Sequence, residues 1–449
     1  MEIRELYLSD YIGKQVSVNG WVRNHRRQAH FGFIDLFDGT CFKTIQVVYE
    51  DGLDNFNDIS KILVGSSINV KGVIVESHGK QAFELKANEI TLLGKSDETY
   101  PIQPKRHTRE FFREVAYLRP RAALFQAVFR IRSVASMAIH TYFQDNNYVY
   151  FHSPIITASD CEGAGEMFRV TTLDPSKNQD DKDDFFGKVT GLTVSGQLEA
   201  ETFATAFSKV YTFGPTFRAE NSNTKIHASE FWMIEPEVAF CDLEGIMDIE
   251  EDCLKYIVKY VLDRCSDEID FLNEFVEKGL RNKLEKLLDS KFVRISHKEV
   301  IDILKKADVK WEFLPEYGED IAKEHEKYIT EYFDGPVFIK DWPKDIKAFY
   351  MKQNDDGETV RAVDLEIPGI GELIGGSQRE EDYDKLVNRM KELGMNTEEL
   401  DWYINLRRYG TVEHSGFGIG FERLLLYLTG VDNIRDVIPY PRTPNNCEF

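Results

Sequence analysis

The segment formed by residues 216–238 carries an arginine, acids and an aromatic residue at spacings that could hold a charged ligand. If residues 211–220 form a strand, Arg218 and Glu220 point to the same face, because side chains alternate along a strand. After a polar loop, a second strand would place a further row on one side: Phe231, Met233, Glu235 and Glu237. The alternative is a strand with a surface ion pair and no ligand.

A glycine-rich segment, "GFGIGFERLLLYLTG" (416–430), is typical of a strand that enters a helix. Glu422 and Arg423 fall in the first helical turn, where free N–H groups and the helix dipole favour an anion. A dinucleotide-binding loop would need a βαβ unit around it, and the sequence here does not provide one. We therefore expect a phosphate site in which Arg423 adds positive charge.

A third segment, "GIGELIGGSQRE" (369–380), surrounds Glu372 with glycines and ends near Arg379. Glycines let a ligand approach the backbone, and an acid beside arginines in a nucleotide site is a natural Mg²⁺ ligand. Asp364, eight residues before Glu372, could be its companion. Taken singly, either acid could instead be structural.

The composition limits the kinds of partner. The chain has 449 residues, and 77 acids against 55 lysines and arginines give a net charge of −22. Bulk charge of this sign disfavours nucleic acid, so any RNA contact depends on local basic clusters, which occur in residues 23–27 and 102–132. Six cysteines without a CxxC pair favour a reducing cytoplasm. We expect no signal peptide and no membrane span.

The order of predicted elements indicates an α+β protein with two domains. Five short segments between residues 15 and 94 alternate β-branched or aromatic residues with polar ones, which predicts a five-stranded barrel such as an OB-fold, or another small β domain. A proline-containing linker follows. We place the domains at 1–95, 96–115 (linker) and 116–449, with a helix-rich insertion at about 268–335 and a charged loop at 174–188 that we expect to be mobile.

Together, the three segments resemble the motifs of class II aminoacyl-tRNA synthetases. "FRAE…HASEF" is similar to motif 2, "GFGIGFERL" to motif 3, and residues 125–157 to motif 1, the helix, strand and proline of the dimer interface. A barrel before such a core marks the aspartyl, asparaginyl and lysyl subgroup. "LTVSGQLEAETF", "DLEIPGIGELIGGSQRE" and "YPRTPNNCEF" resemble the bacterial-type asparaginyl enzymes. The resemblance implies an OB-fold barrel plus a catalytic domain built on an antiparallel sheet flanked by helices.

The resemblance also implies how ATP is held. Arg218 would bind the α-phosphate, Arg423 the γ-phosphate end and one face of the adenine, and Phe231 the other face. His227 would contact the phosphates, and Glu220 the adenine. Mg²⁺ would be held by Glu372 and Asp364. Aspartyl relatives often carry a serine three residues after that glutamate, where this chain has Gly375, which leaves a second directly bound metal in doubt.

For the amino acid, the resemblance implies that Gln197 and Arg379 hold the substrate and that Ser195 and Glu162 are candidates for its α-amino group. Aspartyl enzymes carry a lysine where this chain has Ala200, and Glu220 could accept from an amide NH₂. A neutral amide then fits better than a second carboxylate. The expected reaction is activation of asparagine by ATP and transfer to tRNA(Asn). The alternatives are a non-discriminating aspartyl enzyme and an inactive RNA-binding protein.

In the barrel, Phe33 and Gln46 match the positions that stack on and hydrogen-bond the central anticodon uridine, with Arg26 near the RNA backbone. The alternative for Phe33 is a buried barrel residue. For assembly, we expect a homodimer whose interface uses an apolar stripe with Pro154: Phe125, Val128, Phe129 and Ile139.

Overall fold

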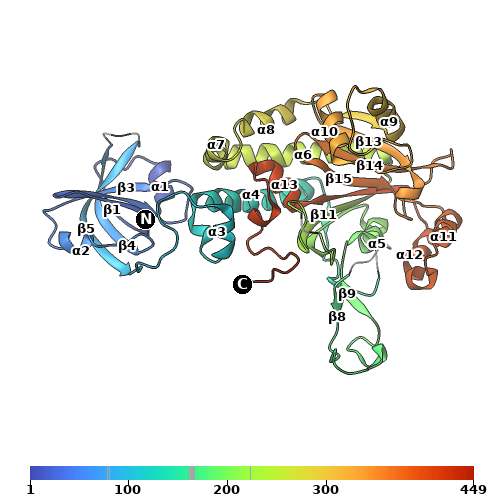
Figure 1. Ribbon diagram of the computed structural model, residues 1–449, viewed down its shortest axis with the longest axis horizontal. Helices are drawn as coiled ribbons and strands as arrows, with labels where there is room; N and C mark the ends of the chain where they lie inside the picture. The colour runs from blue at the N-terminus through green and yellow to red at the C-terminus, as the bar shows by residue number, and fades with distance from the viewer. Residues whose placement is uncertain (78, 80, 160, 162–166, 223) are drawn as a thin grey trace. The chain divides into compact units, whose positions relative to one another are not determined.

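A computed structural model describes all residues of the chain except 78, 80, 160, 162–166 and 223 (Figure 1). The chain divides into two compact units, Met1–Ala127 and Val128–Phe449. The predicted domain boundaries at residues 95 and 116 stay predictions.

The first unit contains a closed five-stranded barrel in the order β1-β2-β3-β5-β4, which confirms the OB-fold prediction. Its strands are β1 (Gln15–Arg27), β2 (Phe31–Phe37), β3 (Ile45–Glu50), β4 (Ser67–Glu76) and β5 (Phe83–Gly94). Its helices are α1 (Ile3–Leu8), α2 (Phe56–Ile59) and α3 (Arg109–Glu114). Helix α3 lies in the segment expected to be a linker, and Thr108 caps it by accepting a hydrogen bond from the N–H of Phe111 at 3.2 Å.

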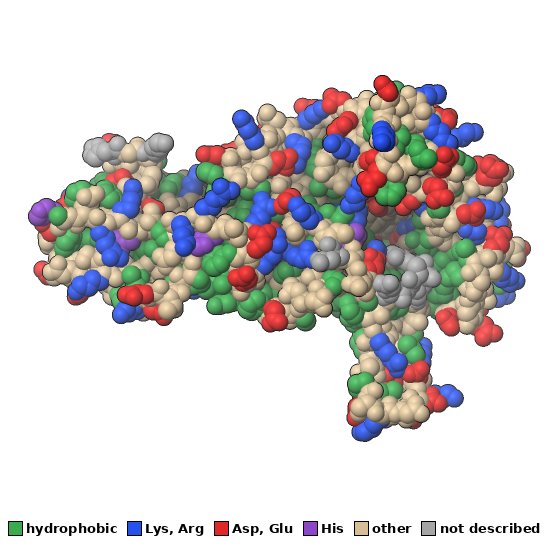
Figure 2. All heavy atoms as spheres, viewed as in Figure 1, with side chains coloured by type: hydrophobic (Ala, Val, Ile, Leu, Met, Phe, Trp, Pro, Cys, Tyr) green, Lys and Arg blue, Asp and Glu red, His purple; other side chains and the backbone are tan. Residues whose placement is uncertain are grey.

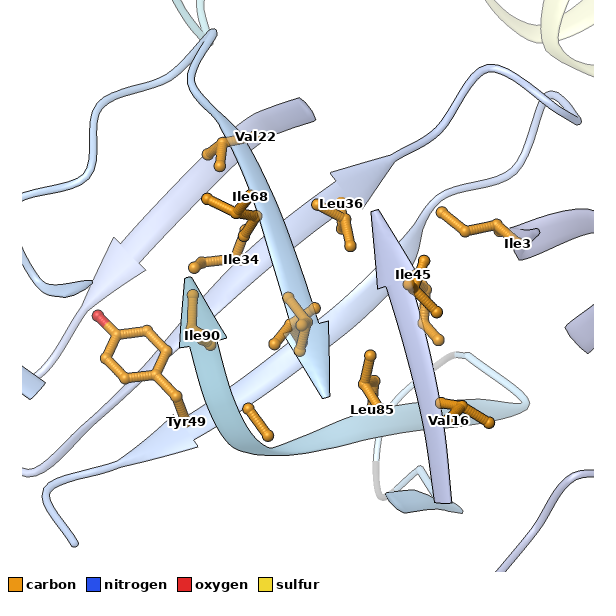
Figure 3. Packing of buried hydrophobic residues seen from close by; sticks show 14 of the residues in the cluster. Ile3, Val16, Val22, Ile34, Leu36, Ile45, Tyr49, Ile68, Leu85 and Ile90 are labelled. Atoms are coloured by element: carbon orange, nitrogen blue, oxygen red, sulfur yellow. The ribbon is translucent and has the colours of Figure 1, made fainter. Parts of the chain in front are cut away.

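The barrel core follows from the alternation seen in the sequence. Every second residue in the first half of β1 is buried, so one face of the strand is apolar and faces the barrel axis. Figure 3 shows branched side chains from all five strands, joined by Ile3 of α1, meeting in the interior. Gly72 on β4 allows a close approach there, because a methyl group at this position would lie 2.1 Å from the carbonyl oxygen of Lys86.

The second unit is built on an eight-stranded sheet in the order β12-β13-β14-β15-β16-β11-β10-β6. The strands are β6 (Val149–Tyr150), β10 (Lys209–Phe217), β11 (Glu230–Ala239), β12 (Val293–Ser296), β13 (Val337–Pro343), β14 (Thr359–Ile367), β15 (Gly371–Gln378) and β16 (His414–Gly420). The central pairs are antiparallel, as expected, whereas the outermost pairs, β6 with β10 and β12 with β13, are parallel.

Helices cover the sheet and confirm the α+β prediction. They are α4 (Ala123–Asp145), α5 (Gln197–Phe207), α6 (Leu243–Arg264), α7 (Ser266–Phe275), α8 (Leu280–Asp289), α9 (His297–Lys306), α10 (Lys323–Tyr332), α11 (Tyr383–Glu392), α12 (Asp401–Asn405) and α13 (Phe421–Thr429). Helix α6 packs along β14, β15 and β16, α5 packs on β10 and β11, and α13 packs on β11 and β16. The sheet centre is therefore held between helices.

Three local predictions need correction or detail. The strand expected to reach Glu220 ends at Phe217, so Arg218 begins the loop that follows. The strand of the motif 1 segment is broken at Pro154, as its sequence predicts, into β6 and β7 (Ile156–Thr157), which belong to different sheets. The helix-rich segment 268–335 also contains a strand, β12, which extends the main sheet by pairing with β13.

A small three-stranded sheet, β7-β9-β8, carries the segment that follows motif 1 (Figure 1). It adds β8 (Arg169–Val170) and β9 (Thr190–Leu192). Between them, Asp184 accepts hydrogen bonds from the N–H and Oγ of Thr172 at 2.9 and 3.0 Å and from the N–H of Phe185 at 2.8 Å. A hydrogen bond from the Thr171 side chain, followed by the one from the N–H of Thr172, lowers the pKa of Asp184. The predicted mobility of 174–188 stays a prediction.

All six cysteines are free. Among the described residues, no helix is both long enough and apolar enough to cross a membrane. On the face shown in Figure 2, acidic and basic side chains are interspersed over the larger unit.

Candidate active site and RNA-binding face

A cavity of about 190 Å³ lies over the middle of the main sheet. It is lined by all six residues predicted to bind ATP: Arg218, Glu220, His227, Phe231, Glu372 and Arg423. They come from the β10–β11 loop, β11, β15 and the start of α13, which are far apart in the sequence. The sheet order explains the convergence, because β11, β16 and β15 are consecutive neighbours.

The two arginines of this cavity are oriented by neighbours. The guanidinium carbon of Arg218 lies 5.5 Å from the ring centre of Phe231. Nη1 of Arg423 donates to the carbonyl oxygen of Glu372 at 2.8 Å and lies 3.5 Å from its Oε2. Burial, followed by the positive charge of Arg423, lowers the pKa of His227, so this ring is neutral near pH 7.

Glu422, next to Arg423, has a structural function. Its Oε1 accepts from Nη2 of Arg132 at 2.8 Å, and its Oε2 accepts from the N–H of Trp232 at 2.9 Å. These bonds tie the first turn of α13 to α4 and β11. Arg423 therefore projects from a helix end whose position is fixed, which is what an anion site requires.

A second cavity of about 400 Å³ adjoins the first, and Arg218, Met233, Glu372 and Gly418 line both. Three residues predicted for the amino acid are in its wall: Ser195, Gln197 and Arg379. Asp364, predicted as a metal ligand, also lines it. The shared residues place the first cavity directly beside the larger polar cavity, with Arg218 in the wall of both.

The most buried ion pair of the second cavity joins Arg379 to Glu237. Nε of Arg379 donates to Oε2 of Glu237 at 3.2 Å, and Nη2 donates to Oε1. Nη1 donates to Oγ of Ser377 at 2.6 Å. Although burial opposes it, Glu237 raises the pKa of Arg379, which therefore stays charged. The bidentate contact fixes the plane of the guanidinium group.

A second acid, Glu235, organises the start of α5. Oγ of Ser195 donates to its Oε1, and the N–H of Gly196 donates to its Oε2 at 3.0 Å. The sequence predicted that Glu235 and Glu237 share a face with Phe231 and Met233, and all four line the cavities. It did not assign the two acids to the amino-acid side.

Lys347 and Tyr350 line the second cavity and were missed by the sequence analysis. Both lie between β13 and β14, in a segment without glycine pattern or periodicity. Lys347 is one of several cations in the stretch before Asp364, so its position in the sequence gives no reason to select it as a site residue.

Three predicted amino-acid contacts are not brought to the second cavity. Ala200 is completely buried against Phe151, Ala204 and Val210, so it packs in the core instead of facing a ligand. Glu220 lines only the nucleotide cavity, because β10 ends before it. Glu162 lies outside the described residues.

Asp364 and Glu372 converge above Gly375. A methyl group on Gly375 would lie 3.3 Å from Oε1 of Glu372 and 3.5 Å from Oδ1 of Asp364. Nζ of Lys347 donates to the other oxygen of Asp364 at 2.5 Å. Burial and then Glu372 raise the pKa of Asp364 to about 6, with Lys347 opposing. The carboxylates of Asp364 and Glu372 repel each other, and a Mg²⁺ ion, which prefers oxygen ligands, would relieve that repulsion.

No group of three or more metal-ligating side chains suited to hold an ion occurs in the part of the chain that the structure describes. Mg²⁺ commonly uses one or two carboxylates and completes its shell with phosphates and water. The pair formed by Asp364 and Glu372 is therefore sufficient only when a nucleotide is bound.

In the barrel, an open hollow of about 660 Å³ is lined by Phe33 and Gln46. These residues lie on the adjacent strands β2 and β3. Nη2 of Arg26 donates to Oε1 of Gln46 at 2.6 Å, and its guanidinium carbon lies 5.1 Å from the ring centre of Phe33. Phe33 is half-buried and is not part of the barrel core, which argues against the structural alternative.

Three of the four residues of the predicted dimer stripe are contradicted, whereas Phe129 is half-buried and Pro154 is exposed. Phe125, Val128 and Ile139 are 0% exposed within the single chain, so they cannot form a surface for a second copy. Exposed apolar side chains occur instead along α4, the edge strand β6, β7 and α5: Met137, Val149, Tyr150, Ile156, Phe203 and Phe207.

Comparisons with known proteins agree over the whole chain. The family model described as tRNA synthetases class II (D, K and N) matches residues 108–444, and the one described as OB-fold nucleic acid binding domain matches residues 16–93. The chain is 58% identical over 461 residues to the asparagine–tRNA ligase of Acholeplasma laidlawii, with 100% of both covered. It is 55% identical over 458 residues to that of Clostridium beijerinckii, covering 100% of this chain and 99% of the relative.

Solved structures give the same result. The structure of asparaginyl-tRNA synthetase from Pyrococcus horikoshii complexed with asparaginyl-adenylate superimposes with a TM-score of 0.85 at 33% identity, covering 97% of this chain and 96% of that one. The corresponding complex from Entamoeba histolytica gives a TM-score of 0.85 at 26% identity, with 98% of each chain covered.

Proposed function

The chain belongs to the class II tRNA synthetases of the aspartate, lysine and asparagine group, and we propose from this how its two adjoining cavities work. It is an asparagine–tRNA ligase, which joins asparagine to tRNA with ATP. The observation that supports the residue assignments best is that Arg218 lines both adjoining cavities.

In our proposal, ATP occupies the first cavity and asparagine the second. Arg218 then lies where the α-phosphate meets the carboxylate of the amino acid. Phe231 and Arg423 hold the adenine between them, and neutral His227 donates to the phosphates. The asparagine carboxylate attacks the α-phosphorus and pyrophosphate leaves, so no general base is needed. The arginines stabilise the charge that develops.

The preference for asparagine over aspartate follows from the pairing of the cations in the second cavity. Arg379 is engaged by Glu237, and Lys347 is engaged by Asp364. An aspartate side chain would bring a further negative charge into a site whose cations are compensated, and desolvating it would be costly. The oxygen of an asparagine amide can accept from Arg379 without adding charge to the site. The paired cations therefore favour asparagine.

We propose Mg²⁺ as the metal, held by Asp364 and Glu372 together with phosphate oxygens. When bound, it neutralises phosphate charge. Gly375 leaves open space beside both carboxylates, and the absent serine hydroxyl would have to be replaced by water.

For tRNA(Asn), we propose that Phe33 stacks on an anticodon base and that Gln46 reads its edge. Arg26 holds the Gln46 carbonyl oxygen, which leaves the Gln46 amide group oriented. We also propose a cytoplasmic homodimer in which the exposed apolar residues of β6 and α5 face the second copy. Sedimentation showing an active monomer at micromolar concentration would contradict the dimer.

The residues of the two cavities argue against both alternative functions. An inactive RNA-binding protein would not need Arg218 and Arg423 in one cavity with His227 and Phe231. An aspartate-accepting enzyme would need a free cation for the second carboxylate, and Ala200 does not supply one.

The test is ATP–pyrophosphate exchange with asparagine and with aspartate. We expect at least about a 10⁴-fold preference for asparagine in kcat/KM, because a mismatched ligand leaves buried groups unpaired. Comparable exchange with both amino acids would contradict the proposal for the second cavity while leaving the nucleotide assignment intact.

A further inference from the structure

Glu201, a carboxylate outside both cavities, is the centre of a buried hydrogen-bond network. It lies on α5 and is 0% exposed. Its Oε2 accepts from Nη2 of Arg407 at 2.8 Å and from Nε2 of His414 at 2.9 Å. The hydroxyl of Tyr403 donates to Oε1 at 2.8 Å. Although burial opposes ionisation, Arg407 and then His414 hold the pKa of Glu201 well below its usual range.

The network reaches the second cavity through Gln197, one helical turn before Glu201. Nε2 of Gln197 donates to Oε1 of Glu201 at 3.2 Å. An ionised carboxylate can only accept hydrogen bonds, so the Gln197 amide must turn its NH₂ group toward Glu201. Among the described residues, none donates a hydrogen bond to the side-chain amide oxygen, Oε1, of Gln197. That oxygen is therefore the acceptor that Gln197 can present to a ligand in the cavity.

The charges around the cavity indicate which ligand group this oxygen takes. Arg379 follows β15 and Lys347 lies between β13 and β14, and each is already paired with a carboxylate, Glu237 and Asp364. The side formed by β11 and the start of α5 carries Glu235, Ser195 and Gln197. An α-ammonium group is attracted by the carboxylate of Glu235 and by the oxygen acceptors beside it. It therefore belongs beside the Gln197 carbonyl oxygen.

We propose that Glu201 is a positioning residue for amino-acid binding: it fixes the orientation of the Gln197 amide so that its oxygen accepts from the substrate α-ammonium. The proposal rests on the proposed function, because it takes asparagine as the ligand of the second cavity. Glu201 itself does not touch the substrate. Its effect is transmitted by a single side chain and is specific for one group of the ligand.

The experiment uses Glu201→Gln in the full-length protein. A carboxamide at position 201 can donate to the Gln197 oxygen, which removes the constraint on the Gln197 orientation. We expect the KM for asparagine in pyrophosphate exchange to rise about 10- to 100-fold, as for loss of a hydrogen bond to a charged group, with kcat and the KM for ATP nearly unchanged.

The decisive probe is succinamate, which is asparagine without its α-amino group. Its inhibition constant should stay within about twofold of the wild-type value, since it has no ammonium group to lose a partner. An equal loss for asparagine and succinamate would show that Glu201 only supports the fold, and would overturn the proposal. Absence of asparagine-dependent exchange in the unmodified protein would instead contradict the proposed function.

Two further variants control for stability. Tyr403→Phe removes a different donor to Glu201 without touching Gln197, so it should leave the ratio of asparagine KM to succinamate inhibition constant unchanged. Glu201→Asp keeps the negative charge beside Arg407 and His414 but withdraws it from Gln197. It should reproduce the selective loss even if Glu201→Gln folds poorly, and a wild-type ratio in Glu201→Asp would count against the proposal.

Discussion

The catalytic cavities and the barrel face hold their arginines in opposite ways. Arg379 is 3% exposed and bound at two oxygens by a carboxylate that is itself completely buried. Arg26 on the barrel rests on a neutral amide and a half-buried ring. The first arrangement suits a small charged ligand, since fixed charges act strongly away from water. The second suits a base, which needs an open flat surface and one oriented amide.

The strongest test of this difference is Arg218→Ala. We expect pyrophosphate exchange to fall about 10²- to 10³-fold, or about 3 to 4 kcal/mol, by analogy with loss of a transition-state donor. Arg423→Ala should act similarly. The matched control is Arg281→Ala, which removes an arginine paired with Asp270 on the surface and should leave exchange unchanged. Near-normal exchange in Arg218→Ala would refute the nucleotide assignment.

Ala200→Lys tests whether position 200 belongs to the cavity or to the core. Because Ala200 is completely buried among apolar side chains, we expect the lysine to lower the free energy of unfolding by about 2 to 3 kcal/mol. Ala206→Lys, the same change at an exposed position of α5, is the control and should cost little. Urea unfolding measures both. A stable Ala200→Lys protein with altered amino-acid preference would restore the contact predicted from sequence.

Phe33→Ala separates the two regions directly. Loss of one stacked base should weaken tRNA binding by about 1 to 3 kcal/mol, so charging at low tRNA concentration falls about 10- to 100-fold. Pyrophosphate exchange without tRNA should not change, because Phe33 belongs to the barrel. If both assays fall together, Phe33 is needed for folding and does not read RNA.

Glu250→Gln should have the smallest effect, and it concerns pH. Glu250 on α6 is 0% exposed, and neither of its carboxyl oxygens has a hydrogen-bond partner among the residues that the structure describes. Burial and then Asp364 raise the pKa of Glu250 well above its usual range. The folded state therefore binds this proton more tightly than the unfolded state, and stability falls as pH rises above about 4.5.

Between pH 5 and pH 8, the wild-type protein should lose at least about 1 kcal/mol more stability than Glu250→Gln. The measurement is urea unfolding of both proteins across this pH range. Parallel stability curves would show that Glu250 ionises with the same pKa in the folded and unfolded states.

The sequence predicts those elements that show a periodic hydrophobic pattern or a recognisable motif. The alternation in residues 15–94 predicted the barrel, and the glycines before Arg423 predicted a strand followed by a helix, because both patterns follow from local geometry. It failed where a contact depends on distant packing. Nothing around Ala200 indicates that Phe151 and Val210 enclose it, and nothing around Phe125 or Ile139 distinguishes a core stripe from an interface.

The same limit applies to the pairing of charges. Glu237 and Arg379 are separated by 142 positions, and Glu201 and Arg407 by 206, so their partnership appears only when the sheet has formed. The resemblance to known motifs supplied most of the predicted residues that line the two cavities. It could not supply the residues behind them, such as Glu201, because those act through a neighbour.

Strand β12 has a consequence for any attempt to shorten the protein. It comes from the segment that reads as an insertion, yet it pairs with β13 from Val293 to Ser296 and closes one border of the main sheet. Deleting residues 268–335 would bare the main-chain N–H and C=O groups of β13, and such an edge recruits strands from other molecules. A minimal catalytic core would therefore have to keep residues 293–296 or carry a substitute strand to avoid self-association.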